Sequence, residues 1–201
     1  MARLVDDLLL LARADVGQLP LQRELVEIDE VCRQAARALA PLAATQRVSL
    51  HSAPAARAIL VLGDELHLSQ VVRNLVDNAI RHTPPGGTVA IGVAEDADGA
   101  ASPDTVRVRV IDTGPGVPQE ERERIFERFH RLTGNATAND AGRSGSGLGL
   151  AICRAIVMAH GGQIRADKGG RGWRAVRRHP APAARCIRPL TALGYAARLR
   201  C

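Results

Sequence analysis

Three groups of residues in this 201-residue chain have the types and spacings needed to bind a phosphate-bearing ligand and a metal ion. The first group lies in NLVDNAIRHT at 74–83, where a helical wheel aligns four polar side chains opposite an apolar stripe. Amide oxygens at i and i+4 can ligate a hard cation such as Mg²⁺, and an arginine can contact a phosphate. A solvated helix face is the alternative, although asparagines inside a helix lower its propensity. The four residues are Asn74, Asn78, Arg81 and His82.

The other two groups are rich in glycine. Asp112 ends a predicted strand, and Gly114 and Gly116 after it permit positive φ and a close backbone approach to a ligand. An ordinary turn is the alternative. The segment GSGLGL at 145–150 opens a predicted helix, whose N-terminal N–H groups can bind phosphate. It differs from a dinucleotide-binding fingerprint because its glycines alternate and no strand directly precedes it.

The composition excludes several classes of protein. Lys168 is the one lysine, and its neighbours fit neither a P-loop nor the lysine-bearing strand of a protein-kinase fold. The four cysteines are far apart in sequence, which argues against a zinc site and for reduced thiols in the cytosol. No run of 18 apolar residues is present, and acidic residues interrupt the first 15, so we expect neither a membrane span nor a secretory signal.

The net charge of +6 is unevenly distributed along the chain. Residues 171–201 hold eight arginines and no acidic residue, which leaves 19 basic and 21 acidic side chains in residues 1–170. The basic character therefore belongs to the last 31 residues, and we expect no nucleic-acid binding by the preceding domain. Aromatic residues make up only 2%, too few for a base-stacking platform.

Hydrophobic periodicity and turn residues predict alternating helices and strands that bring these groups together. Asp29 and Asp64 are expected to cap the second and third helices, and Pro118 to open the fourth. A Gly-, Asn- and Ser-rich loop spans 130–147, a length that usually serves a function. The expected helices cover 3–15, 29–44, 65–83, 119–129 and 148–160, and the expected strands 21–28, 47–51, 58–63, 88–95, 106–112 and 162–167.

The order of these motifs resembles the catalytic ATP-binding domain of bacterial sensor histidine kinases, in the Bergerat-fold ATPase superfamily. NLVDNAIRHT resembles the N box, DTGPGVP at 112–118 the G1 box, IFERFHR at 125–131 the F box and GSGLGLAI at 145–152 the G2 box. HGGQI at 160–164 is similar to the segment that usually follows. The resemblance implies an α+β fold, a two-layer sandwich in which a mixed, largely antiparallel sheet packs on three helices, with an additional N-terminal helix.

The resemblance also implies a role for each matching residue. Asn78 would hold Mg²⁺ with help from Asn74, Asp112 would accept a hydrogen bond from the adenine amino group, and Phe126 and Phe129 would anchor the lid formed by 130–147. Core packing is the alternative for both phenylalanines. Asn74, Asn78 and Arg131 would act in catalysis. The ATP-binding set would comprise Asn74, Asn78, Arg81, His82, Asp112, Gly114, Gly116, Arg131, Gly145, Ser146, Gly147, Leu148 and Gly149.

The chain departs from the family pattern at both ends. None of its six histidines has the sequence context of a phosphoacceptor. Residues 1–17 resemble the end of a second dimerisation helix, so we expect a chain truncated before the acceptor, dimeric only if the missing helices are present. The ATP-binding domain would cover 18–170. We expect 171–201 to be disordered or frame-shifted, because alignment on Pro180 would bury Arg177. A basic tail that binds acidic lipid or nucleic acid is the alternative.

These features predict transfer of the ATP γ-phosphoryl group to a histidine on another chain, within a phosphorelay. Superfamily hydrolases carry a glutamate where this chain has Asn74, which favours transfer to a protein over water attack. The expected partners are a response regulator receiver domain and an acceptor-histidine dimerisation domain. The expected location is the cytoplasm, although full-length relatives are usually anchored in the inner membrane. Two alternatives remain: an ATP-binding regulatory module without turnover that binds a response regulator, and an anti-sigma-type serine kinase.

Overall fold

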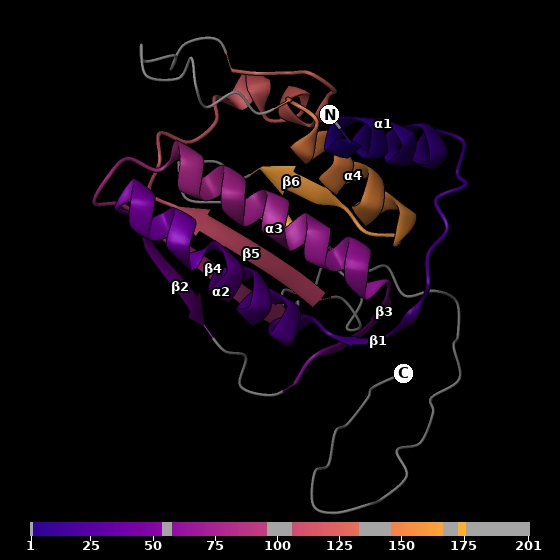
Figure 1. Ribbon diagram of the computed structural model, residues 1–201, viewed down its shortest axis with the longest axis horizontal. Coiled ribbons are helices and arrows are strands. Elements are labelled where there is room, and N and C mark those ends of the chain that lie inside the picture. The colour runs from indigo at the N-terminus through magenta and orange to yellow at the C-terminus, as the bar shows by residue number, and fades with distance from the viewer. Residues whose placement is uncertain (1, 54–57, 96–105, 133–145, 167–172, 176–201) are drawn as a thin grey trace, which may run out of the picture.

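The computed structural model describes residues 2–53, 58–95, 106–132, 146–166 and 173–175 (Figure 1). Its elements, in chain order, are α1 (Ala2–Asp15), β1 (Glu24–Glu27), α2 (Ile28–Gln46), β2 (Ser49–Ala53), β3 (Leu60–Gly63), α3 (Glu65–His82), β4 (Thr88–Glu95), β5 (Val106–Asp112), the 3₁₀ turns η1 (Gln119–Glu121) and η2 (Arg124–Phe126), α4 (Gly149–Ala159), β6 (Ile164–Ala166) and β7 (Trp173–Ala175).

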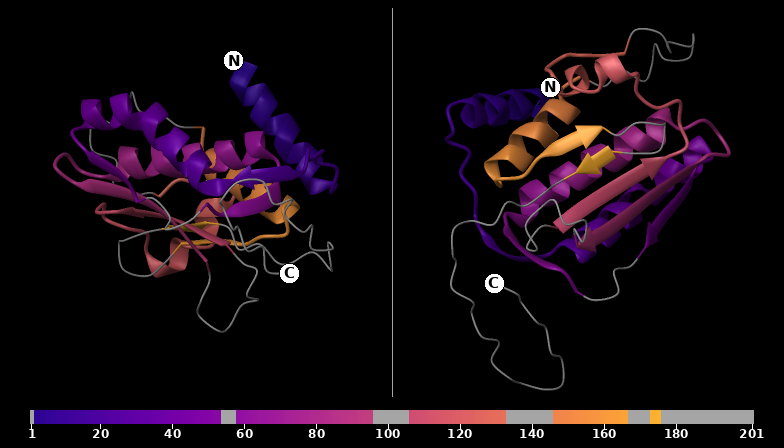
Figure 2. Two further views of the ribbon diagram at one scale, coloured as in Figure 1. Left: turned by 90° about the horizontal axis from the view of Figure 1, so that it is seen from below. Right: turned by 180° about the vertical axis from the view of Figure 1, so that it is seen from behind.

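The strands form a five-stranded sheet in the order β2-β4-β5-β7-β6 and a two-stranded antiparallel sheet of β1 and β3. Within the larger sheet only β2 and β4 run parallel, so the sheet is mixed and largely antiparallel, as predicted. Helices α2, α3 and α4 pack on one face of it (Figure 2, left). The expected two-layer arrangement of the Bergerat fold is therefore confirmed.

Side-chain alternation along the strands separates a buried inner face from an outer face. On β5, Val108 and Val110 lie in the core under the helices, whereas Arg109 between them points to the other face. Val89 and Ile91 of β4 occupy equivalent inner positions. The helices complete the core with aliphatic side chains, in keeping with the scarcity of aromatic residues.

Asp64 joins three segments at the N-terminal end of α3. One carboxylate oxygen accepts from the backbone N–H of His67 at 3.0 Å, which is the predicted N-cap, and the other accepts from the N–H of Gln22 at 2.9 Å. The Asp64 N–H in turn donates to Nε2 of His160 at 3.0 Å. Burial alone would raise the pKa of Asp64, but the hydrogen bonds outweigh it and the pKa is lowered.

His160 is held neutral by the same junction. Its Nδ1 lies 2.8 Å from the Ile156 carbonyl, which can only accept, so Nδ1 carries the proton and Nε2 is free to accept from Asp64. Burial lowers the pKa of His160 below its ordinary value of 6.5. Protonation of Nε2 would remove the acceptor, so the contact between α4 and α3 requires the neutral ring.

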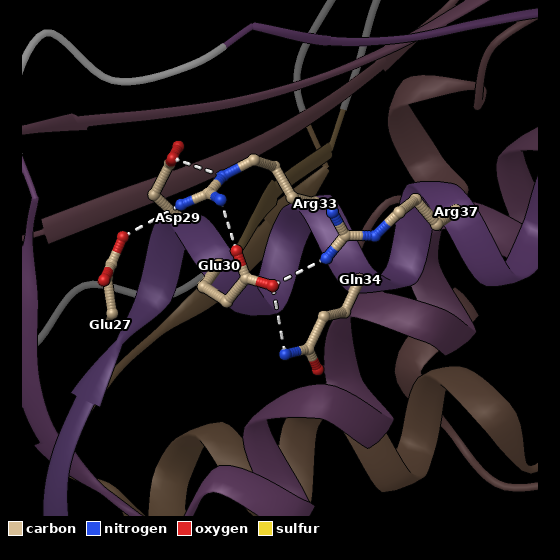
Figure 3. A network of polar contacts seen from close by, with 6 residues as sticks. All are labelled: Glu27, Asp29, Glu30, Arg33, Gln34 and Arg37. Atoms are coloured by element: carbon tan, nitrogen blue, oxygen red, sulfur yellow. Dashed lines mark hydrogen bonds and ion pairs between the residues drawn. The ribbon is translucent and has the colours of Figure 1, made fainter.

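Helix α2 begins two residues earlier than a cap at Asp29 would give, and Asp29 does not cap it. Glu27 occupies the cap position without a side-chain hydrogen bond, and the N–H of Ile28 donates to the carbonyl of Ile59 at 3.0 Å. The buried carboxylate of Asp29 instead accepts from Nε of Arg33 at 3.0 Å. Figure 3 shows the polar network around this first turn, which comprises Glu27, Asp29, Glu30, Arg33, Gln34 and Arg37.

The predicted helix at the N-terminus is confirmed as α1, which packs on α4 (Figure 1). Leu11 is buried in this contact, and Asp15 at the helix end pairs with Arg128. Four further apolar residues on α1 stay exposed, namely Leu4, Val5, Leu8 and Leu9. No helix in the described ranges is both long and apolar enough to cross a membrane.

The short strand β7 corrects one expectation. Trp173–Ala175 pair with both β5 and β6, so the expectation of disorder from residue 171 onward is wrong for these three residues. Backbone hydrogen bonds to β5 and β6 do not depend on the side chains of the pairing segment, which explains the pairing despite the atypical sequence. The remaining residues of the basic tail, 176–201, lie outside the described residues.

Replacement of Asp64 tests the junction. Asp64→Ala removes the α3 cap and leaves the Gln22 N–H without its acceptor, so we expect a loss of about 1–2 kcal/mol in the free energy of unfolding. Urea denaturation followed by circular dichroism measures it. The exposed neighbour Glu65, changed to Ala, is the control. Equal unfolding midpoints for both variants would contradict the role of Asp64.

The lowered pKa of His160 predicts acid-sensitive stability. Below pH 6.5 the unfolded chain protonates this ring before the folded protein does, so the free energy of unfolding falls as the pH decreases from 6.5 toward the folded-state pKa. His160→Gln cannot titrate and should show a shallower fall over the same interval. Parallel stability curves for the two proteins between pH 7 and pH 5 would refute this expectation.

Candidate functional site

The orientation of α3 is set by its buried apolar residues, and this orientation determines where its polar side chains lie. Leu75, Val76 and Ile80 are completely covered by the core, whereas Asn74 and Asn78 are half-buried. The two amides therefore lie beside the buried stripe, not opposite it as the wheel predicted.

Asn74 connects α3 to the beginning of α4. Its Nδ2 donates to the Gly149 carbonyl at 3.4 Å, which turns the amide nitrogen toward α4 and leaves Oδ1 for another partner. Behind this contact the thiol of the buried Cys153 donates to the Val71 carbonyl at 3.7 Å, and burial raises the pKa of Cys153 to about 12. The thiol is thus un-ionised and joins α4 to α3 through the Val71 carbonyl.

Arg81 and His82, at the end of α3, are both exposed. Nε of Arg81 donates to the Asp77 carboxylate at 2.8 Å, a hydrogen bond that raises the pKa of the guanidinium. Arg81 is therefore on the same helix as the asparagines but is engaged with its own neighbour. The His82 carbonyl lies against the turn that follows β5.

The turn that follows β5 packs closely against the C-terminal end of α3. Asp112 at the end of β5 is buried and accepts from the Gly114 N–H at 2.8 Å. A Cβ on Gly114 would lie only 2.7 Å from the His82 carbonyl oxygen, so only glycine permits this approach. The Thr113 hydroxyl accepts from the Thr88 N–H at 2.9 Å, which attaches the turn to β4.

The segment after the turn differs from its prediction. Instead of one helix opened by Pro118, the chain forms the two 3₁₀ turns η1 and η2. Ile125 and Phe126 are buried in a small satellite cluster under α4, and this local packing takes precedence over continuous helical periodicity. Phe126 thus packs in a core, whereas Phe129 is 61% exposed.

A backbone bridge connects the two flanks of the glycine-rich loop. The Phe129 N–H donates to the Gly147 carbonyl at 3.0 Å, and both residues have positive φ. A Cβ on Gly147 would meet the Phe129 Cα at 2.9 Å. The exposed Arg131 follows this bridge, and residues 133–145, which include Gly145 of the predicted phosphate loop, lie outside the described residues.

The start of α4 supplies backbone rather than side-chain groups. Ser146 Oγ accepts from the Leu148 N–H at 3.4 Å. The Leu148 side chain is fully buried, so only its main chain can face a ligand. A Cβ on Gly149 would meet only the Asn74 amide nitrogen, at 4.0 Å, which leaves this helix N-terminus open.

These contacts place the Asp112 turn and the start of α4 against α3, which carries the predicted polar residues. Gly149 and Gly114 both contact α3, at Asn74 and His82 respectively, and Gly116 has the positive φ of 73° expected for the turn. The motifs assigned no role to Asp77 and Thr113, which hold Arg81 and the turn respectively. The spacing of four between Asp77 and Arg81 could have revealed the first of these.

The described residues contain no group of three or more His, Cys, Asp or Glu side chains suited to a metal ion. A metal at this site would therefore depend on amide oxygens and on groups of the ligand itself, which fits a hard cation such as Mg²⁺.

Comparison with known proteins gives the site its context. The family model "Histidine kinase-, DNA gyrase B-, and HSP90-like ATPase" matches residues 63–182. The chain is 34% identical over 167 residues to the adaptive-response sensory kinase SasA of Gloeothece citriformis, covering 83% of this chain and 40% of that protein. It is 36% identical over 165 residues to the signal transduction histidine-protein kinase BaeS of Escherichia coli, covering 82% and 33%. The chain thus spans two-fifths or less of these relatives.

Solved structures give the same picture. Full-length ShkA in complex with AMPPNP matches with a TM-score of 0.69 and 32% identity, over 90% of this chain and 37% of that one. The catalytic domain of the histidine kinase ThkA matches with a TM-score of 0.63 and 25% identity, over 79% and 95%. The chain therefore belongs to the histidine kinase-, DNA gyrase B- and HSP90-like ATPase family, as a histidine kinase-like ATPase domain of the sensor-kinase type.

Proposed function

We propose that this chain binds ATP with Mg²⁺ along α3 and transfers the γ-phosphoryl group to a histidine on a separate dimerisation domain. The observation that carries this proposal is the placement of the Asp112 turn and the α4 N-terminus on the same helix, through the Gly114 and Gly149 contacts. A polar helix face flanked by two open, glycine-lined backbone segments suits a nucleotide triphosphate. The related ShkA structure contains the ATP analogue AMPPNP.

Each described residue has a role in this proposal. Asn78 holds Mg²⁺, with Asn74 beside it. The buried Asp112 accepts a hydrogen bond from the adenine amino group, and the N–H groups near Gly147 and Gly149 receive the phosphates. Arg81, His82 and Arg131 add positive charge or hydrogen bonds around the nucleotide, as do Gly116, Ser146 and the Leu148 main chain.

The bound metal ion would supply neutralisation of phosphate charge. The protein residues bind, orient and exclude water, because phosphoryl transfer depends mainly on positioning and electrostatics. A ring nitrogen of the neutral acceptor imidazole forms the new bond to phosphorus while the bond to the β–γ bridging oxygen breaks and ADP leaves. The amide at Asn74 cannot act as a base toward water, which favours a protein acceptor.

The relatives that support this proposal are sensory kinases. By their analogy we propose that a response regulator receiver domain takes the phosphoryl group from the acceptor histidine. We also propose that α1 is the end of a dimerisation helix, since its exposed leucines lack a described partner layer within the chain. The ATP-binding domain would then cover residues 18–170.

Replacement of Asn78 tests the metal site. Asn78→Ala should lower the affinity for ATP in the presence of Mg²⁺ at least about tenfold, because the amide ligand is lost. Titration calorimetry with and without Mg²⁺ measures the effect. Gln34→Ala, which removes an exposed amide from α2, is the matched control and should bind normally. Wild-type affinity in Asn78→Ala would refute the assigned role.

Incubation with γ-labelled ATP tests the transfer. The chain alone should remain unlabelled, and addition of an acceptor-histidine dimerisation module from a relative should give acid-labile label on that module, absent with Asn78→Ala. If ATP binds but no module is labelled, the chain is a binding module rather than a kinase. Label on a histidine of this chain alone would contradict a separate acceptor.

A further inference from the structure

Phe129 has a backbone conformation that its side chain disfavours. Its φ of 60° lies in the left-handed region, which a bulky aromatic residue rarely adopts. Among the described residues the one other non-glycine with positive φ is Arg47, which ends α2 as an ordinary left-handed cap. Phe129 caps no helix, and its ring is exposed rather than packed. Contacts of the neighbouring residues are therefore needed to hold this conformation.

Side-chain pairs attach the residues on both sides of Phe129. Arg128, before it, pairs with Asp15 at the end of α1. His130, after it, directs Nε2 at the Glu121 carboxylate, 2.7 Å from Oε2. The backbone on each side of Phe129 is thus tied to a different element, and these two attachments restrict the rotation that would relieve its positive φ.

The contact between Glu121 and His130 is the stronger of the two attachments. Their side chains are 23% and 14% exposed, against 42% and 56% for Arg128 and Asp15, and exposed ion pairs contribute little to stability. A carboxylate oxygen accepts, so Nε2 of His130 carries the proton and donates to it. The other oxygen of Glu121 accepts from the exposed Arg124 at 3.1 Å. Glu121 thus closes the segment from 121 to 130 on itself.

The backbone of Phe129 fixes a peptide unit at the start of α4. Its N–H donates to the Gly147 carbonyl at 3.0 Å. In a trans peptide the C=O and the following N–H point in opposite directions, so this bond turns the Leu148 N–H away from Phe129. Among the described residues the Leu148 N–H meets only Ser146 Oγ, at a long 3.4 Å. It is therefore a backbone donor that is already oriented and only weakly engaged.

Apolar packing holds the same segment against α4. Ile125 and Phe126 of η2 are buried, and Leu150 in the first turn of α4 packs against them. The packing fixes the position of the segment relative to the helix, whereas the hydrogen bond from Phe129 fixes the direction of the Gly147 peptide. The segment from 121 to 130 and the start of α4 therefore form one unit, in which a change at Glu121 can reach the Leu148 N–H.

We propose that Glu121 is a positioning residue for triphosphate binding, acting through His130. Glu121 holds His130, the attached backbone keeps Phe129 at positive φ, and the Phe129 N–H thereby directs the Leu148 N–H toward the phosphates. This inference rests on the proposed function, because it gives the Leu148 N–H a phosphate as its partner. A donor that is oriented before the anion arrives needs no reordering on binding, which increases the affinity.

Glu121→Ala tests this role in the full chain, by NMR titration with Mg²⁺-ATP and separately with adenosine. We expect ATP to bind roughly tenfold more weakly, as the loss of one aligned hydrogen bond to a charged group implies. Adenosine should bind as before, because the adenine end of the proposed site lies at the Asp112 turn. Glu121→Gln keeps an oxygen that can accept from His130 and should restore most of the ATP affinity.

Arg124→Gln is the matched control, because it removes the other partner of Glu121 and leaves the His130 contact in place. It should bind ATP normally. Exchange of the Phe129 amide hydrogen, followed by NMR without nucleotide, provides a second readout. This exchange should be roughly tenfold faster in Glu121→Ala than in the unchanged chain, because the bond to Gly147 opens more often.

Several results would overturn the positioning role of Glu121. Unchanged ATP affinity in Glu121→Ala would do so, and so would equal losses for ATP and adenosine, which indicate general damage to the fold. An equal loss in Arg124→Gln, or unchanged exchange of the Phe129 amide, would also overturn it. Absence of ATP binding by the unchanged chain would instead refute the proposed function itself, and with it any phosphate at the Leu148 N–H.

Discussion

Burial of the apolar stripe of α3 is the constraint on which the rest of the structure depends. Each fully buried aliphatic side chain such as Leu75 or Ile80 contributes roughly 1.5–3 kcal/mol, so rotation of the helix about its axis would be strongly unfavourable. A helix fixed in this way also fixes its other side. Asn74 can therefore contact Gly149 while the His82 carbonyl contacts Gly114, without either contact having to orient the helix.

The sequence predicts most of the fold because its signals are local. The period of α3, the Asp64 cap and the alternation in β5 all depend on neighbours within a few residues. Three predictions failed where distant residues decided the outcome. Asp29 does not occupy the cap position because the N–H of Ile28, one residue before it, donates to the Ile59 carbonyl. The segment after Pro118 forms two 3₁₀ turns instead of one helix because Ile125 and Phe126 pack in a satellite cluster. Strand β7 forms because its backbone pairs with β5 on one side and β6 on the other.

The candidate site was predictable in its residues more than in its contacts. The motifs located Asn74, Asn78 and Asp112, and the structure places them on or beside one helix. The positive φ of Phe129 was not predictable, since it accompanies a backbone bond to Gly147, which is distant in the sequence. Likewise, the wheel could not show that the Asn74 amide would donate to the Gly149 carbonyl of another helix.

The bond between Phe129 and Gly147 has a consequence for how this domain can vary. It joins the backbone on the two sides of residues 133–145, so the ends of that stretch of sequence are held together irrespective of its length. The entropy of closing such a loop grows only logarithmically, and doubling its length costs about 0.6 kcal/mol. Insertions or deletions between these two residues should therefore cost little stability, so the number of residues here can change during evolution without disturbing the bond between Phe129 and Gly147.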